Sequence, residues 1–146
     1  GGDVFISGSL YATQPQSYHF AEDITNNTEH YLGVISSGLA NASFNPMRHQ
    51  FIAPYKGSVT HAFVRSETSD GSNPVNVKVY SSTGTDAVTG GSSSTAAITV
   101  SSANTTHSGK VGHDFGPGDA IAVSVQRSTT APNEICLTLV FEYIIE

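Results

Sequence analysis

The sequence predicts an all-β domain, an antiparallel β-sandwich or jelly roll of about eight or nine strands. Short stretches in which apolar and polar residues alternate recur along the 146 residues, and this period of two is typical of half-buried strands. Clusters of Gly, Pro, Asn and Ser separate these stretches and favour turns. No window of a dozen residues shows the apolar period of a helix, so a parallel α/β fold with crossover helices is excluded.

The first thirteen residues are predicted to form a separate segment. Their small, mostly apolar face comprises Val4, Ile6, Gly8, Leu10 and Ala12. We expect residues 1–13 to be a short shaft-like strand or arm that wraps with two further copies around a threefold axis, where Gly8 permits close approach. The alternative is an ordinary first strand of the sandwich. Residues 14–146 are expected to form one jelly-roll domain.

Two predicted strands have the clearest alternation. Residues 75–80 carry Val75, Val77 and Val79 on one face, and residues 120–127 repeat this pattern. Weaker strand patterns cover residues 18–21, 30–34, 49–53, 58–66, 96–101 and 110–115. Turn clusters lie at residues 45–46, 54–57, 69–74, 83–84, 90–94 and 116–119, of which 90–94 is expected to be a surface loop.

The last predicted strand, residues 134–145, is apolar on both faces. Its odd-numbered positions from Ile135 to Ile145 are apolar, and Cys136, Val140 and Ile144 lie on the opposite face. A strand with two apolar faces is normally covered on both sides. We therefore expect the odd-numbered face to fill the sandwich and the other face to contact neighbouring subunits or a second layer.

The charge distribution excludes several classes of partner. Charged residues make up 12% of the chain, and the formal net charge is −6, with the 6 Lys and Arg residues far apart. Without a clustered basic face, binding to nucleic acid is not expected.

The longest apolar runs are well short of the roughly 20 residues that span a bilayer, so we expect no membrane insertion. The single Cys136 cannot form an intrachain disulfide.

Candidate catalytic and metal-binding residues do not form a pattern. The six histidines have no metal-ligand spacing, and His113 and Asp114 would point to opposite faces of a strand. The acidic residues lie mostly in predicted turns, and Asp119 is interpreted as a turn residue whose carboxylate accepts local backbone N–H bonds. The nucleophile motif G-x-S-x-G is absent. We expect no enzyme active site, no metal and no cofactor; the alternative for the histidines is a set from three copies that meets on a threefold axis.

A sugar-binding site is the alternative that the residues support. Tyr80, Asn76, Asn73 and Asp70 combine an aromatic ring with amide and carboxylate groups near the predicted strand 75–80. Tyr31, Tyr55 and Asp86 are further candidates of the same kind. Such side chains hold sugars when they are exposed together, although tyrosines on strands are also common in cores and interfaces.

Two sets of motifs resemble known proteins. Residues 2–12, Gly-Asp-Val-Phe-Ile-Ser-Gly-Ser-Leu-Tyr-Ala, resemble the G-D-x-x-I-x-G-x-L repeats in the shafts of bacteriophage tail fibres. Residues 51–59, 115–123 and 139–143 resemble globular domains of phage structural proteins, which are similar to the trimeric jelly roll of tumour-necrosis-factor and complement-type heads. In that family F-x-A-P-x-x-G opens a core strand, and F-x-x-G-D-x-I-x-V turns tightly into another.

This resemblance implies a non-catalytic homotrimer on the virion surface, as the head of a fibre or spike or as a capsid decoration protein bound to other virion proteins. The expected trimer interface comprises Val4, Ile6, Leu10, Cys136, Val140 and Ile144. The alternative function is a carbohydrate-binding module that recognises a host surface glycan or polysaccharide. A glycan-degrading tailspike would need paired acids, and the sequence pattern does not provide them.

Overall fold

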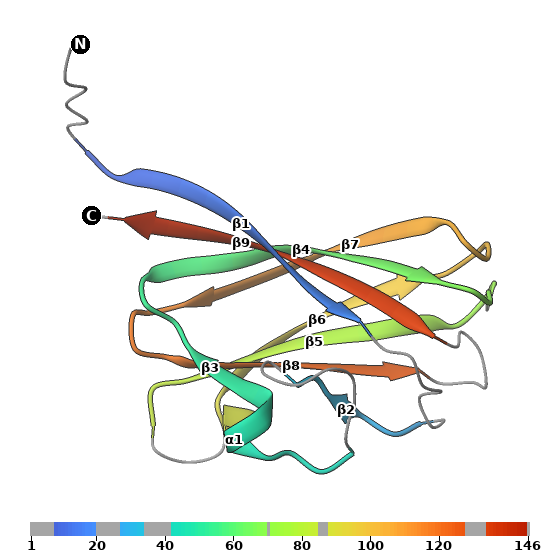
Figure 1. The fold of residues 1–146 in the computed structure, drawn as a ribbon, viewed down its shortest axis with the longest axis horizontal. Coiled ribbons are helices and arrows are strands. Elements are labelled where there is room, and N and C mark those ends of the chain that lie inside the picture. Colours follow the sequence, from blue (N-terminus) through green and yellow to red (C-terminus); the bar gives the residue numbers. More distant parts are fainter. Residues whose placement is uncertain are drawn as a thin grey trace.

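Two antiparallel β-sheets pack face to face in this protein and form a β-sandwich (Figure 1). The computed structural model describes residues 8–19, 27–33, 42–69, 71–84, 88–127 and 134–145. Nine strands lie in these residues, accompanied by two very short helical segments. The predicted all-β sandwich is confirmed.

Each sheet is built from strands that are distant in the sequence. The four-stranded sheet has the order β1 (Leu10–His19), β9 (Ile135–Ile145), β4 (Lys56–Ser66) and β7 (Thr106–Phe115). The five-stranded sheet has the order β2 (His30–Tyr31), β8 (Ala120–Arg127), β5 (Pro74–Ser82) and β6 (Ser92–Thr99), with β3 (Gln50–Ile52) also paired to β8. The helical segments are α1 (Pro46–His49) and the 3₁₀ turn η1 (Val88–Gly90).

The strand pairs are nested within one another. The outermost pair is β1 with β9, followed by β2 and β3 with β8, then β4 with β7, and finally the hairpin of β5 with β6. All these pairs are antiparallel, and the chain passes from one sheet to the other after β6, β7 and β8. This nesting is the connectivity of a jelly roll.

The core fills the space between the two sheets with the residues that the alternation predicted. The odd-numbered side chains of β9 from Ile135 to Tyr143 are buried, as are Val75, Val77 and Val79 of β5. The ring of Phe141 contacts those of Phe51, Phe115 and Tyr143 at centroid distances of 5.8 to 6.2 Å. The expectation that the odd-numbered face of β9 fills the sandwich is confirmed.

One part of the core is polar. His113 of β7 is buried, and its two ring nitrogens lie 3.1 Å from the Ser94 hydroxyl and 2.9 Å from the Ser81 hydroxyl of the opposite sheet. Ser81 in turn lies 2.9 Å from the Ser92 hydroxyl. Asp114, the next residue after His113, is exposed, so the predicted opposite orientation of this pair is confirmed.

The turn between β7 and β8 is closed by Asp119. Its Oδ2 atom accepts a 2.7 Å hydrogen bond from the backbone N–H of Gly116, and the carboxylate is buried. The predicted role of Asp119 as a turn residue is confirmed. Because this bond fixes the turn, it also fixes where β8 enters the five-stranded sheet.

Several element boundaries differ from the sequence-based expectation. Residues 92–94, expected to be a surface loop, belong to β6 and pair with residues 79–81 of β5. Strand β7 begins four residues before the predicted position 110, at Thr106. Strand β1 begins at Leu10, continues past position 13 and pairs with β9 along its whole length. Residues 1–7 of the predicted shaft-like segment lie outside the described residues.

Candidate functional site

The outer face of the five-stranded sheet gathers charged and amide side chains at its centre. Because Val75, Val77 and Val79 point into the core, Asn76, Lys78 and Tyr80 of β5 lie on the outer face. The strand register places Gln126 of β8 beside Asn76, and Ser124 of β8 beside Lys78. The outer face is therefore polar at residues 76 and 78 and aromatic at residue 80.

An aromatic cluster covers the end of this face that contains Tyr80. The Tyr31 ring lies 5.3 Å from that of Phe44 and 6.2 Å from those of His49 and Tyr80. His49 is buried, and its Nδ1 atom accepts a 2.9 Å hydrogen bond from the backbone N–H of Asn45. Burial, followed by the charge of Arg48, lowers the pKa of His49 below its ordinary value. The cluster is thus held by a neutral histidine.

Glu29 reaches the same face from the segment that runs along the edge of β8. This segment is fixed by backbone hydrogen bonds from Asn27 N–H to the Arg127 carbonyl, 2.9 Å, and from Leu32 N–H to the Val123 carbonyl, 3.0 Å. Between these two bonds, Glu29 is half-buried over the sheet. Its position is therefore set by the backbone on both sides.

Three hydroxyl groups donate hydrogen bonds to the Glu29 carboxylate. Oε1 accepts from the Tyr80 hydroxyl and from Ser124 Oγ, and Oε2 accepts a 3.5 Å bond from the Tyr31 hydroxyl. Burial, with the hydrogen bond and charge of Glu29, raises the pKa of Tyr80 to about 12. Burial and the charge of Glu29 also raise the pKa of Tyr31. Both tyrosines are therefore protonated donors at neutral pH.

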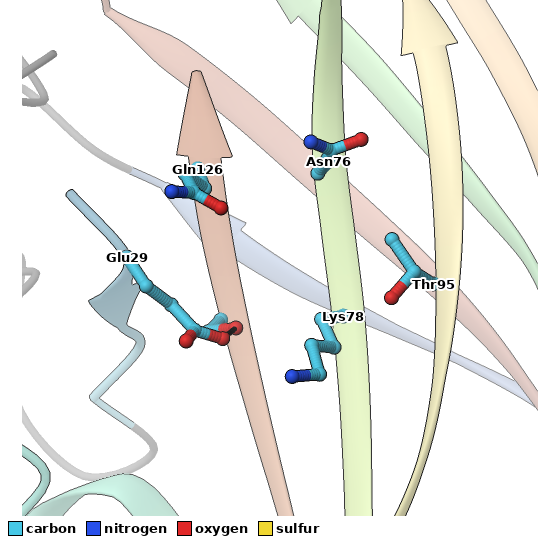
Figure 2. Close-up of a pocket in the computed structure, with 6 residues that line it drawn as sticks. Glu29, Asn76, Lys78, Thr95 and Gln126 are labelled. Atoms are coloured by element: carbon cyan, nitrogen blue, oxygen red, sulfur yellow. Dashed lines mark hydrogen bonds between the residues drawn. The ribbon is translucent and has the colours of Figure 1, made fainter. Parts of the chain in front are cut away.

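Beside this carboxylate the sheet surface has an open hollow of about 240 Å³, the polar hollow, lined by Glu29, Asn76, Lys78, Thr95, Ser124 and Gln126 (Figure 2). In Figure 2 the side chain of Lys78 extends from β5 toward the side of the hollow on which Glu29 lies. The Lys78 Nζ atom lies 4.5 Å from the centroid of the Tyr80 ring, which is a cation–π distance. The polar hollow thus brings one carboxylate, one ammonium group, two amides and two hydroxyls together.

The predicted sugar-binding residues separate in the structure. Asn76 lines the polar hollow, and Asn73 is half-buried in the turn that precedes β5. Tyr80 is only 3% exposed, so it offers no exposed ring to a sugar, in line with the alternative that a tyrosine on a strand belongs to a core or interface. Tyr31 belongs to the aromatic cluster, Tyr55 is exposed in the turn before β4, and Asp70 and Asp86 lie outside the described residues.

Sequence reasoning identified Asn76 but missed the other five lining residues: Glu29, Lys78, Thr95, Ser124 and Gln126. Glu29 is separated from Ser124 by 95 positions, and no motif connects them. Lys78 and Gln126 could have been placed on this face from the alternation of their strands, because both occupy positions between core residues.

The predicted trimer-interface residues lie on the four-stranded sheet where the structure describes them. Cys136, Val140 and Ile144 of β9 are half-buried on its outer face, and Leu10 is 44% exposed at the beginning of β1. Thr138 and the exposed Glu142 alternate with the three apolar residues, so this face of β9 is mixed in character. Val4 and Ile6 lie outside the described residues.

On the same outer face, Tyr11 pairs with Ile144, and Phe63 pairs with Thr138 between Cys136 and Val140. Tyr11 is 71% exposed, and Phe63 is also exposed. We call Tyr11, Phe63, Cys136, Val140 and Ile144 the apolar strip. None of these five side chains is fully buried by the described part of the chain.

Among the described residues, no group of three or more His, Cys, Asp or Glu side chains is arranged to hold a metal ion. Neither helical segment in the described residues is long and apolar enough to cross a bilayer. The absence of an enzyme active site stays a prediction.

The fold and its two outer faces define a jelly-roll β-sandwich with a polar hollow on one sheet and an apolar strip on the other. No protein-family model matches the sequence, and no curated protein matches it. Among solved structures, the chain is similar to one in the cyanophage Pam1 capsid asymmetric unit, with a TM-score of 0.43 and 12% sequence identity over 98% of this chain and 91% of that chain.

Proposed function

We propose that this chain is a non-catalytic structural protein of a virus particle surface, which works as a homotrimer and contacts other virion proteins. It would serve as the head of a phage fibre or spike, or as a decoration protein on the capsid. The proposal is supported by the motifs at residues 51–59 and 115–123, which resemble those of trimeric phage heads, and by the jelly-roll connectivity that such heads share.

The apolar strip is the observation that carries the trimer. An antiparallel sheet with one free face normally presents polar side chains there, whereas Tyr11, Phe63 and Val140 remain partly exposed on this one. Covering apolar surface contributes about 25 cal/mol per Å², from which the cost of association is subtracted. A threefold assembly in which each strip packs against neighbouring copies would remove this surface from water.

Light scattering after size-exclusion chromatography tests the trimer. The expected mass is three times that of the 15.3 kDa chain. Replacing two strip residues, Val140→Asp with Ile144→Asp, places two carboxylates in the interface and is expected to dissociate the assembly. The matched control is Met47→Asp, because Met47 is 82% exposed on α1, outside the strip. A monomeric wild-type protein contradicts the proposal.

A map of the virus particle by electron cryo-microscopy tests the location separately. We expect density for this jelly roll on the particle surface, in groups of three around a threefold axis. A particle that lacks the chain contradicts the virion role, even where the isolated protein is trimeric.

A further inference from the structure

We propose that the polar hollow is a binding site for a neutral sugar residue of a surface polysaccharide. The inference concerns the five-stranded sheet and does not depend on trimer formation through the four-stranded sheet. It differs from the sequence-based expectation in its residues, because Glu29, Lys78 and Gln126 join Asn76. Tyr80 does not line the hollow but donates a hydrogen bond to Glu29 and lies under the Lys78 ammonium group.

The Glu29 carboxylate is held in an orientation that lets it accept a hydrogen bond from a ligand. The Glu29 carboxylate is held by the hydroxyls of Tyr80, Ser124 and Tyr31, which are all uncharged donors. An ionised carboxylate offers about four acceptor sites, and two of the three hydroxyls share Oε1. Oε2 therefore keeps capacity for a further donor, and its side chain lines the hollow.

Lys78 and Asn76 provide hydrogen-bond donors for a ligand in the polar hollow. Lys78 lies over the Tyr80 ring, and in the described part of the chain its ammonium group makes no hydrogen bond. The same holds for the side-chain amide of Asn76, whereas Gln126 uses its Nε2 atom on the Asn27 carbonyl and keeps Oε1 as an acceptor. The hollow thus presents donors and acceptors side by side on adjacent strands (Figure 2).

The charges that line the polar hollow favour an uncharged ligand. The six lining residues carry one negative and one positive group, so neither a cation nor an anion gains net attraction from them. The chain as a whole has a net charge of −6, which disfavours acidic polysaccharides. A neutral ring with neighbouring hydroxyl groups can donate to Glu29 and accept from Lys78 at the same time.

The size of the polar hollow predicts a small ligand that binds weakly. A volume of about 240 Å³ is below the range of roughly 300–1,000 Å³ that is typical of drug-sized ligands, and it suits a single sugar residue. The Tyr80 ring is covered, so it offers no stacking surface to the sugar. We therefore expect weak binding at each site, with a Kd on the order of 1 mM, and a multivalent assay is needed to detect it.

The test uses the purified full chain, biotinylated at its N-terminus and clustered on streptavidin so that several sites bind at once whether or not the chain forms trimers. It is applied to an array of bacterial surface glycans with neutral, N-acetylated and uronic-acid members. We expect binding to neutral or N-acetylated members. Asn76→Ala and Lys78→Ala should each weaken binding about tenfold or more, because each removes a direct hydrogen bond to the ligand. Lys110→Ala is the matched control, since Lys110 is an exposed lysine of β7 on the other sheet, and it should leave binding unchanged.

Three outcomes overturn the proposal. The first is the absence of binding to every neutral and N-acetylated glycan on the array. The second is binding that Lys78→Ala and Asn76→Ala leave unchanged while thermal melts show both variants folded. The third is a change in the mass of the assembly caused by Lys78→Ala, which would assign the polar hollow to contact between copies of the chain.

Discussion

The backbone N–H of Ala53 donates a 2.8 Å hydrogen bond to the carbonyl oxygen of Asp119, and the Ala53 carbonyl accepts a 2.8 Å bond from the N–H of Gly118. These two bonds join the turn between β3 and β4 to the turn between β7 and β8. The two sequences that resemble phage head domains, residues 51–59 and 115–123, are therefore in direct contact. Their pairing fixes one end of the sandwich, where the chain passes between the sheets.

The Asp119→Ala substitution is expected to lower the free energy of unfolding by about 1–3 kcal/mol, because it removes the buried acceptor of the Gly116 N–H. Asp119→Asn keeps an oxygen acceptor at this position and should cost less. Urea unfolding of the two variants and the wild type measures the difference. Equal stability of wild type and Asp119→Ala would show that the side chain does not hold this turn.

Gly57→Ala is expected to destabilise the sandwich by about 1–3 kcal/mol or more, since added atoms in a packed site force the backbone to move. A Cβ atom at this position would lie 2.3 Å from the carbonyl oxygen of Glu142 and 2.8 Å from the Phe115 ring. At Gly71 a Cβ atom meets nothing within 4 Å, so Gly71→Ala serves as the control. Thermal melts that move equally for both variants contradict the close approach at Gly57.

Two strands, β8 and β9, were predictable almost to the residue, whereas β5 extends beyond the predicted 75–80 to Pro74–Ser82. Strand β8 covers the predicted 120–127, and β9 differs from the predicted 134–145 by one residue, because a buried face imposes its period on the sequence. Residues 92–94 were interpreted as a loop, since a run of Gly and Ser resembles one. Here Ser92 packs its hydroxyl against Ser81 instead, and tertiary contacts decide the conformation.

The polar hollow was predictable only in part. Asn76 was identified from its strand, but the partner that makes it a site, Glu29, comes from a segment far away in the sequence. Glu29 is separated from Tyr80 by 51 positions, and its approach depends on how residues 27–33 run along β8. The burial of Tyr80 depends on the same segment and on Phe44, so the sequence around Tyr80 alone could not predict it.

The protein is expected to lose stability as the pH falls below 6.5, the ordinary pKa of histidine. Burial lowers the pKa of His113 in the folded state, although the charges of Asp114 and Asp119 oppose this effect, and burial also lowers the pKa of His49. The unfolded chain therefore binds more protons between the folded-state and unfolded-state pKa values. The stabilisation is complete above pH 6.5 and decreases as the pH falls toward the folded-state values.

His113→Gln tests the contribution of the buried histidine to this loss. Glutamine retains hydrogen-bonding groups near Ser81 and Ser94 but does not titrate. The comparison uses the change in unfolding free energy between pH 8 and pH 5, so a constant cost of the substitution cancels. We expect a smaller change in the variant, because one of the two histidines whose pKa is lowered by burial has been removed. An identical change in both proteins would exclude His113 as a source.

Cys136 reports on whether the apolar strip is covered in the assembly. Its thiol is free and half-buried in the single chain, on the face that carries Val140 and Ile144. Reaction with a thiol reagent needs access to the sulfur, so labelling in the proposed trimer of the wild-type protein should be at least about tenfold slower than in the dissociated Val140→Asp, Ile144→Asp variant. Rapid, complete labelling of an intact trimer would mean that the subunits meet through another face, and the strip would then be free for a different virion protein.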